Sequence, residues 1–346
     1  MIRVGIAGIG FMGWIHYLAY KNTPGIELAA VSEPNEKRLA GDWRDIQGNF
    51  GPPGEMVDLS GIAKYSDYHD MVADPNIDVV DFCLPPSMHA DAAKAGFAAG
   101  KHVFCEKPMA LKTADCDAMV QAGEAAGRQL FIGHVLPFFP EYAHAVQVIR
   151  SGEYGKLLGG TFKRVISDPL WLKDFYDPDR VGGPLIDLHI HDAHLIRMLF
   201  GMPKAVLSRG RTRNGVVDYC NTAFEFDDSS LVVFATSGVI NQQGRGFTHG
   251  FEIHLEKATL HYEFAGFADE PELMPLKILT EDGKVVRPKV GGGDPTESFR
   301  DEIAEVVRCI QEDKPSEVLA GDLARDAIVL CHKQSQSVLE QRAVEI

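Results

Sequence analysis

The sequence Val4-Gly5-Ile6-Ala7-Gly8-Ile9-Gly10-Phe11-Met12-Gly13 decides the fold of the N-terminal half of the chain. An apolar run over 2–7 predicts a buried parallel strand, and the pattern over 11–20 predicts a helix. The three glycines between them allow a tight turn, the approach of a pyrophosphate to the backbone and close packing of helix on strand. The helix N-terminus offers free N–H groups to the phosphates. We therefore predict a dinucleotide site whose cofactor-binding residues include Gly8, Gly10, Phe11, Met12 and Gly13.

Glu33 follows Gly13 by 20 residues (33 − 13) and comes just after a second apolar strand, predicted over 28–31. An acidic residue at this spacing binds the ribose hydroxyls of a dinucleotide. A carboxylate there also repels a ribose 2′-phosphate. The sequence therefore predicts NAD in preference to NADP, although the neighbouring Lys37 and Arg38 weaken the preference. An ordinary glycine-containing turn is the alternative, and it leaves the strand, helix and acid unexplained.

The composition is that of a globular protein of about two domains, with 346 residues, 45% of them hydrophobic and 24% charged. A formal net charge of −15 argues against nucleic acid and anionic membranes as partners. No apolar run is long enough to cross a bilayer, and a strand that begins at residue 2 leaves no room for a signal peptide. The six cysteines are scattered without a Cys-x-x-Cys pair, so we expect reduced thiols in a cytoplasmic protein.

The rest of the N-terminal half alternates strand patterns with helix patterns, over 77–84, 87–99, 101–105, 113–126 and 129–133. Such alternation predicts right-handed βαβ units on a parallel sheet, where ligands bind at the carboxyl ends of the strands. That rule points to Leu84–Ser87, to Glu106–Pro108 and to the segment from His134 onward. The stretch 41–64 is predicted to be a surface loop, with a flap near the adenosine end of the cofactor as the alternative.

The pattern changes after about residue 151. The segments beyond it are a strand, a long loop, a helix, an antiparallel meander and two closing helices, over 157–166, 167–184, 185–200, 205–279, 299–310 and 322–339. We therefore expect an α/β protein with an N-terminal Rossmann domain, 1–134, and a C-terminal α+β domain, 135–346. The sheet face that its helices leave free predicts a homodimer or homotetramer.

Two sets of residues carry candidate chemistry. Lys107 directly follows a buried strand, where a lysine is costly unless its charge is used; a solvated loop lysine is the alternative. Asp187 and His191 are four apart on a predicted helix and so share one face. A carboxylate beside an imidazole fixes the tautomer and stabilises the imidazolium that forms on proton uptake. A capping aspartate and a satisfied interfacial histidine remain the alternative for this pair.

The motifs that occur in order along the chain are Gly8-x-Gly10-x-x-Gly13, Leu84-Pro85-Pro86-x-x-His89, Ala99-Gly100-Lys101-His102-Val103, Glu106-Lys107-Pro108 and Gly182-Gly183…Asp187-x-x-x-His191. Together they resemble the glucose–fructose oxidoreductase/inositol dehydrogenase/MocA family, nearly from end to end. The resemblance implies a Rossmann domain followed by a large open, mostly antiparallel sheet. It also implies NAD or NADP as cofactor, and sugar, inositol or related polyol substrates.

The same resemblance implies roles for individual residues. Lys107 matches a substrate-binding lysine that follows a cofactor-contacting Glu106 and precedes a cis peptide bond to Pro108. Asp187 matches an aspartate of the site, and His191 its acid/base histidine. The side chains that match a wall beside the nicotinamide ribose are Leu84, Pro85 and His89. The chain departs from the family at Pro137-Phe138, next to His134, where many members carry Arg-Phe.

Two further features concern ligands. At about 100° per residue, His189 and His191 face nearly opposite ways on a helix, so only His191 and His194 share a side. Two ligands make a poor zinc site, and we expect no metal. Trp171 is either a core residue or a platform for the apolar face of a sugar, and its loop favours the platform.

We therefore predict a cytoplasmic NAD-dependent oxidoreductase that acts on a secondary alcohol of a sugar, polyol or inositol. Its catalytic residues are predicted to be Lys107, Asp187 and His191, with His134 and Trp171 as further substrate contacts. One alternative is a redox-neutral glycoside-cleaving enzyme that keeps its NAD tightly bound. Another is a non-catalytic NAD-dependent sensor on the same scaffold.

Overall fold

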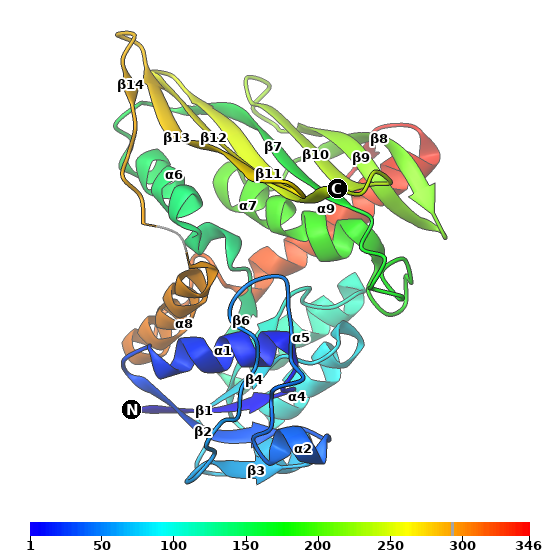
Figure 1. Cartoon of the computed structure of the whole chain (residues 1–346). Coiled ribbons are helices and arrows are strands. Elements are labelled where there is room, and N and C mark those ends of the chain that lie inside the picture. The colour runs from blue at the N-terminus through cyan, green and yellow to red at the C-terminus, as the bar shows by residue number, and fades with distance from the viewer. Residues whose placement is uncertain (292–293) are drawn as a thin grey trace. The chain divides into compact units, whose positions relative to one another are not determined.

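The computed structural model describes residues 1–291 and 294–346, and the described chain divides into two compact units. Unit 1 contains Met1–Phe139 and Gly292–Arg325, and unit 2 contains Pro140–Gly291 and Asp326–Ile346. Each unit is built on one sheet, as Figure 1 shows. The sequence prediction places a single boundary after residue 134, whereas the structure returns a late segment of the chain to unit 1.

The described part of unit 1 contains a six-stranded sheet in the order β3-β2-β1-β4-β5-β6. Neighbouring strands pair in parallel, as the sequence predicts. The strands are β1 (Ile2–Ala7), β2 (Ile26–Ser32), β3 (Ala63–Tyr65), β4 (Val79–Phe82), β5 (His102–Glu106) and β6 (Leu130–Gly133). The strand order reverses between β1 and β4, which is where such sheets bind ligands. The Rossmann prediction is confirmed.

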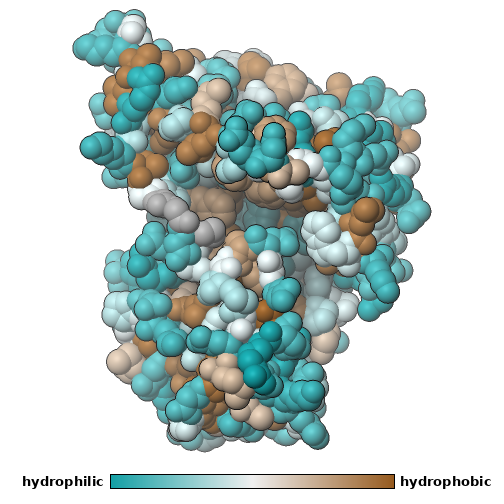
Figure 2. All heavy atoms as spheres, in the orientation of Figure 1, coloured by the Kyte–Doolittle hydropathy of each residue, from teal (hydrophilic) through white to brown (hydrophobic). Residues whose placement is uncertain are grey.

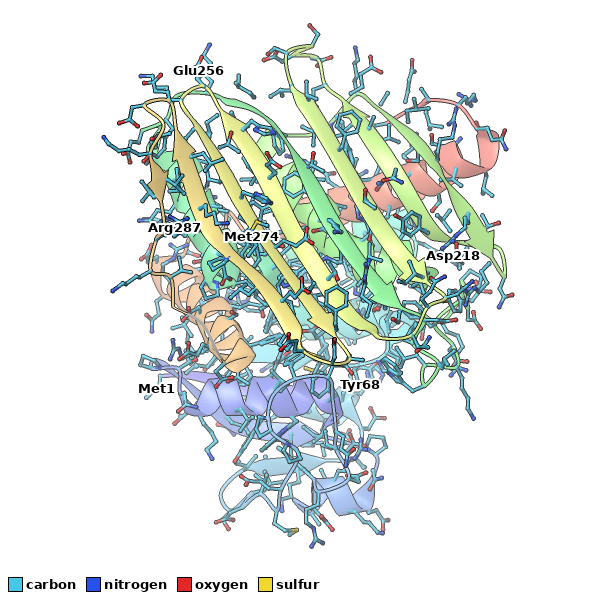
Figure 3. All side chains as sticks on the ribbon, turned by 45° about the horizontal axis from the view of Figure 1, so that its top comes forward. Met1, Tyr68, Asp218, Glu256, Met274 and Arg287 are labelled. Carbon is cyan, nitrogen blue, oxygen red and sulfur yellow. The ribbon has the colours of Figure 1, made fainter. Side chains whose placement is uncertain are left out.

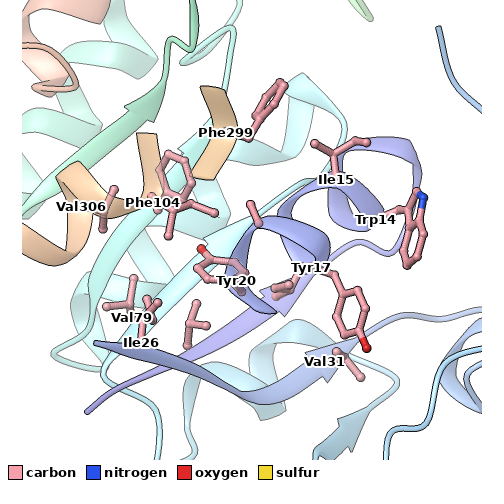
Figure 4. Packing of buried hydrophobic residues seen from close by; sticks show 14 of the residues in the cluster. Trp14, Ile15, Tyr17, Tyr20, Ile26, Val31, Val79, Phe104, Phe299 and Val306 are labelled. Atoms are coloured by element: carbon pink, nitrogen blue, oxygen red, sulfur yellow. The ribbon is translucent and has the colours of Figure 1, made fainter. Parts of the chain in front are cut away.

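The helices of unit 1 are α1 (Phe11–Lys21), α2 (Glu36–Leu39), α3 (Tyr68–Val72), α4 (His89–Ala98), α5 (Thr113–Ala126) and α8 (Pro295–Glu312), with 3-10 turns η1 (Pro86–Met88) and η2 (Leu136–Phe138). Helix α8 comes from the far end of the chain and packs its apolar face against α1 and β5. Figure 4 shows Phe299 and Val306 of α8 in the same buried cluster as Phe104 and Ile15. This burial explains why α8 belongs to unit 1.

Most residues of the segment 41–64 are exposed and form no helix, as expected of a surface loop, but aromatic side chains anchor the segment in the core of unit 1. Trp43 is fully buried, and its ring meets that of Trp14 at 5.9 Å. The Trp14 Nε1–H donates to the carbonyl oxygen of Pro52 at 2.8 Å. Phe50 stacks on Phe299 of α8, with ring centroids 5.5 Å apart. Buried aromatic rings thus hold the segment against two helices.

The described residues of unit 2 form a nine-stranded sheet in the order β14-β13-β12-β11-β7-β10-β9-β8-β15. The strands are β7 (Leu157–Ser167), β8 (Ala205–Arg213), β9 (Val216–Glu225), β10 (Val232–Ile240), β11 (Arg245–Leu255), β12 (Ala258–Phe267), β13 (Pro271–Thr280), β14 (Val285–Val286) and β15 (Val344–Glu345). β7 and β10 pair in parallel, whereas the pairs on either side are antiparallel. The predicted large, mostly antiparallel sheet is confirmed.

The two faces of this sheet differ because side chains alternate along each strand. One row across the strands is buried: Val206, Phe224, Val233, Gly160, Ile253, Leu260 and Ile278. The next row is partly or fully exposed: Leu207, Ala223, Phe234, Thr161, Glu252, His261 and Lys277. In unit 2, α6 (Pro140–Ser151), α7 (Ile190–Phe200) and α9 (Gly321–Glu340) cover the buried side.

Figure 3 looks onto the opposite, helix-free side of the sheet. Hydrophobic side chains are interspersed with hydrophilic ones over the face of the molecule shown in Figure 2. Within residues 1–291 and 294–346, no helix is both long enough and hydrophobic enough to span a membrane.

Candidate functional site

The glycine turn after β1 has the geometry that a dinucleotide requires. Gly8 has a φ of +92°, and a Cβ there would lie 2.5 Å from the carbonyl oxygen of Cys83. A Cβ at Gly13 would lie 2.1 Å from the carbonyl oxygen of Gly8, so the helix can pack this closely only with glycine. At Gly10, by contrast, a Cβ would meet no heavy atom of the described chain within 4 Å. The backbone is therefore open where a pyrophosphate approaches the helix N-terminus, and these residues fit the cofactor.

Glu33 lies beside this turn, as the sequence predicts. It is 7% exposed. Its Oε2 accepts the backbone N–H of Ile9 at 2.8 Å, and its Oε1 accepts that of Asn35 at 2.9 Å. Arg38 donates to the carbonyl oxygen of Ile9 at 3.0 Å and pairs with Asp45 at 2.8 Å. The turn thus has a negative charge beside it, and the nearby guanidinium already has a carboxylate partner.

The residues expected beside the nicotinamide end lie at the carboxyl ends of β4, β5 and β6. Leu84 is half-buried and Pro85 is exposed. His89 is buried, and its ring nitrogens lie 2.8 Å from the carbonyl oxygen of Leu84 and 2.9 Å from that of Pro108. His89 therefore connects the loop after β4 to the loop after β5 by hydrogen bonds. His134 is buried just after β6.

Lys107 is half-buried at the end of β5, and the Lys107–Pro108 bond is cis, as the family resemblance implies. The preceding Glu106 is 5% exposed. Its Oε2 accepts the backbone N–H of Lys107 at 3.1 Å, and its Oε1 lies 3.0 Å from His16 Nε2. Glu106 thus joins the lysine to a buried histidine that the sequence reasoning missed. The available signal was a histidine on the apolar face of the first helix.

In unit 2, Asp187 lies in a π-helical turn, η3 (Leu185–His189), and His191 in the first turn of α7. Both are half-buried, whereas the residues between them, 188–190, are buried. The two side chains therefore share the more accessible side of this segment, as predicted, although a π-helical turn was not predicted. Such turns are frequent at functional sites.

The other histidines of this segment face the interior of unit 2. The Gln334 amide lies 3.0 Å from His189 Nε2, and both His189 and His194 are buried. In the part of the chain that the structure describes, the group of three or more His, Cys, Asp or Glu side chains whose possible ligand atoms all lie within 4.8 Å of one another is His16, Asp81 and Cys83, in unit 1. The candidate trio His189, His191 and His194 is not that group.

Trp171 is 65% exposed, and its neighbours Leu170 and Leu172 are exposed as well. The structure therefore excludes the alternative that Trp171 is a core residue of unit 2. An exposed indole is available to pack against the apolar face of a sugar.

Residues 2–134 match a family described as "Oxidoreductase family, NAD-binding Rossmann fold", and residues 142–261 match the "GFO/IDH/MocA C-terminal domain". The chain belongs to the Gfo/Idh/MocA family of NAD-binding oxidoreductases. It is 26% identical to a myo-inositol 2-dehydrogenase of Thermotoga maritima, over 100% of this chain and 98% of that protein. It is 26% identical to a D-xylose 1-dehydrogenase (NADP(+)) of Haloferax volcanii, over 89% of this chain and 88% of the relative.

Among solved structures, the chain resembles levoglucosan dehydrogenase in complex with NADH and levoglucosan. The TM-score is 0.80 at 23% identity, with 100% of this chain and 99% of that chain covered. This likeness supports the fold. The predicted family, its NAD-binding Rossmann domain and the oxidoreductase class acting on CH–OH groups are confirmed.

Proposed function

We propose that this enzyme transfers hydride between NAD and a secondary alcohol of a sugar, polyol or inositol. The observation that carries the proposal is the pair Asp187 and His191, which stay accessible on a segment whose intervening residues are buried. A capping aspartate and a structural histidine need no such exposure. The inositol and xylose dehydrogenases to which the chain is similar support the substrate class.

We assign the acid–base work to His191. In the oxidising direction it takes the hydroxyl proton, while Asp187 orients its ring and stabilises the imidazolium. The ammonium of Lys107 stabilises the charge that develops on the substrate oxygen. NAD, when bound, supplies the hydride acceptor. His134 and Trp171 are both assigned to substrate binding. His134 is a buried residue just after β6, and Trp171 is assigned as a platform for the apolar face of a sugar.

The remaining cofactor contacts are assigned to both ends of the dinucleotide. The residues at the phosphate and adenosine end are Gly8, Gly10, Phe11, Met12, Gly13 and Glu33. Those at the nicotinamide end are Leu84, Pro85, His89, Glu106 and Lys107. In this assignment His89 acts through the loops that it joins, because its own side chain is buried.

The test is a panel of sugars and inositols with NAD, followed by NADH absorbance. With an active substrate, His191→Ala should lower turnover by roughly 10²–10⁴-fold while NAD affinity stays within about twofold. The matched control is His69→Ala, which removes an exposed histidine of α3. Unchanged turnover in His191→Ala would overturn the assignment. Tight, co-purifying NAD with substrate cleavage and no net NADH would favour the glycoside-cleaving alternative.

NAD should be preferred to NADP because Glu33 is negative and the positive charge of Arg38 is already paired. Asp45→Asn frees the Arg38 guanidinium for a ribose 2′-phosphate, so the ratio of kcat/KM for NADP to that for NAD should rise about tenfold or more. Asp42→Asn is the control, because Asp42 pairs with Arg44 rather than with Arg38. An unchanged ratio in Asp45→Asn would show that Arg38 does not face the ribose.

We also propose a homodimer or homotetramer that packs through the helix-free face of the unit 2 sheet. Leu207, Ala223 and Phe234 form the apolar end of its exposed row. Phe234→Glu should therefore shift the mass measured by light scattering toward the monomer, whereas Met56→Glu, at an exposed site in unit 1, should not. A wild-type monomer at micromolar concentration would contradict this.

The six free cysteines support a cytoplasmic location.

A further inference from the structure

A cluster of titratable side chains is buried in unit 1 beneath the end of β5. Its members come from four different elements: His16 of α1, Asp81 of β4, Glu106 of β5 and Glu302 of α8. His16, Asp81 and Glu302 are 0% exposed and Glu106 is 5% exposed. Burying several ionisable groups together is costly unless each is paired. We call this cluster the His16 network.

The hydrogen bonds of the network connect Asp81, through His16 and Glu106, to the backbone of Lys107. His16 Nδ1 lies 2.8 Å from Asp81 Oδ2, and His16 Nε2 lies 3.0 Å from Glu106 Oε1. The other oxygen of Glu106, Oε2, accepts the backbone N–H of Lys107 at 3.1 Å. Tyr20 also donates to Asp81 Oδ2, at 2.9 Å. A chain of bonds therefore leads from the buried aspartate to the peptide of the lysine.

The two carboxylates require His16 to donate from both ring nitrogens, which only the imidazolium can do. Burial is the largest single influence and opposes this charge, but Asp81 and Cys83 together raise the pKa of His16 well above its ordinary value. The side chain of Cys83 also faces Nδ1, at 3.4 Å. Its thiol stays protonated, because burial and Asp81 raise the pKa of Cys83 to about 12.

Glu302 of α8 is buried close enough to Glu106, His16 and Asp81 for their charges to affect it. Neither of its oxygens has a hydrogen-bond partner among the described protein atoms. Burial, and then the nearby Glu106, raise the pKa of Glu302 well above its ordinary value, so the carboxyl is neutral and able to donate. Gly133 leaves room for Glu106, since a Cβ there would lie 3.0 Å from Glu106 Oε1.

A metal ion, instead of a proton, could join His16 and Asp81, because possible ligand atoms of His16, Asp81 and Cys83 lie close together. Two ligands of a tetrahedral zinc lie about 3.3 Å apart at Zn–N and Zn–O distances of about 2.0 Å. His16 Nδ1 and Asp81 Oδ2 are 2.8 Å apart, which is a direct hydrogen bond. The geometry favours a shared proton over a metal.

We propose that the His16 network is a positioning device for Lys107, and this proposal rests on the proposed function. The imidazolium holds the carboxylate of Glu106 through Oε1, and the neutral Glu302 adds no second negative charge beside it. Glu106 then holds the Lys107 amide and so fixes the direction in which the lysine leaves β5. His16 and Glu302 are positioning residues, and neither touches substrate.

The first test needs neither cofactor nor substrate. Hydrogen exchange of the Lys107 amide, detected by NMR in the cofactor-free protein, should be at least about tenfold faster in His16→Gln than in wild type. The control is His69→Gln, an exposed histidine of the same unit. An unchanged rate at Lys107 in folded His16→Gln would overturn the proposal, whatever the substrate. If His16→Gln does not fold, Glu106→Gln makes the same test, because its amide cannot accept from both partners.

The second test is a double-mutant cycle on turnover. His16→Gln should lower kcat by roughly 10–100-fold with little change in KM, but should cost almost nothing more when Lys107→Met is already present. Equal losses in both backgrounds would mean a merely structural role. Glu302→Gln, which keeps a neutral donor, should retain more turnover than Glu302→Leu; equal losses would overturn the role of Glu302. If Lys107→Met itself leaves turnover unchanged, the proposed function fails while the exchange test still stands.

Discussion

The buried polar clusters of the two units differ in the sign of the charge that faces their histidines. In unit 1, His16 lies between Asp81 and Glu106 and is held as an imidazolium. In unit 2, Arg164 makes a two-bond pair with Asp192, at 2.7 and 3.1 Å, and both are buried. Burial and the Arg164 charge lower the pKa of the nearby His249 to about 3.

Burial penalises a charged imidazole in both clusters, so burial alone does not decide protonation. The fixed charge that faces the ring decides it. His249 accordingly shares a 2.9 Å hydrogen bond with the Tyr142 hydroxyl, as a neutral ring can. The chain therefore keeps His16 protonated, one hydrogen-bonded residue away from the candidate catalytic lysine. It keeps His249, in the core of unit 2, neutral.

The largest expected effect comes from removing the buried guanidinium of Arg164 in unit 2. Arg164→Met leaves Asp192 buried without its partner and should cost about 3–5 kcal/mol of stability. The measurement is urea-dependent hydrogen exchange of β7 amides, which reports on unit 2. Adding Asp192→Leu should recover most of the loss, because two apolar side chains replace the pair. A loss under about 1 kcal/mol for Arg164→Met would show that Asp192 is neutral.

The next effect is acid sensitivity in unit 2. The folded-state pKa of His249 is lowered to about 3, so the unfolded chain binds a proton that the folded chain excludes as pH falls below about 6.5. His249 should therefore cost unit 2 about 2–3 kcal/mol between pH 6.5 and 4.5. His249→Phe should remove that share of the acid loss in the same exchange experiment. Carboxylates titrate in wild type and in His249→Phe alike, so a difference between their pH slopes comes from His249. Identical slopes in the two proteins would contradict the prediction.

The opposite sign is expected in unit 1. The folded-state pKa of His16 is raised, so the stability that it contributes is fully present below the ordinary histidine pKa and is lost as pH rises through the folded value. His16→Gln should therefore destabilise unit 1 more at pH 6 than at pH 9. The fluorescence of Trp14 and Trp43, both buried in unit 1, can follow its unfolding. A penalty that grows with pH would mean that His16 is neutral in the folded protein.

Local pattern was enough to predict much of this molecule. The glycine turn and the turn at Lys107 depend on a few neighbouring residues, and both were located from the sequence. Short apolar runs separated by polar or glycine-containing turns likewise predicted the antiparallel strands of unit 2, and the family resemblance implied that they form one large sheet. The position of Glu33 beside the turn follows from its spacing alone.

The rest depends on contacts between distant segments. The return of α8 to unit 1 and the anchoring of Trp43 rely on apolar surfaces that an amphipathic pattern shows without naming their partners. Glu302 looks like a solvated helix residue until α8 is placed on α1. The π-helical turn at Asp187 was missed because it covers only five residues, too few to leave a period of its own in the sequence.

The smallest expected effect tests whether the neutral histidine of unit 2 is held by its hydrogen bond or only by the absence of a nearby anion. Tyr142→Phe removes the hydroxyl that lies 2.9 Å from His249 Nδ1 and should cost about 1 kcal/mol at pH 7. In a His249→Phe background the same change should cost less, because the hydrogen bond to His249 is already absent. Exchange of β11 amides (Arg245–Leu255) measures both values. If Tyr142→Phe costs the same in both backgrounds, the bond contributes nothing, and the Arg164 charge and burial suffice to keep His249 neutral.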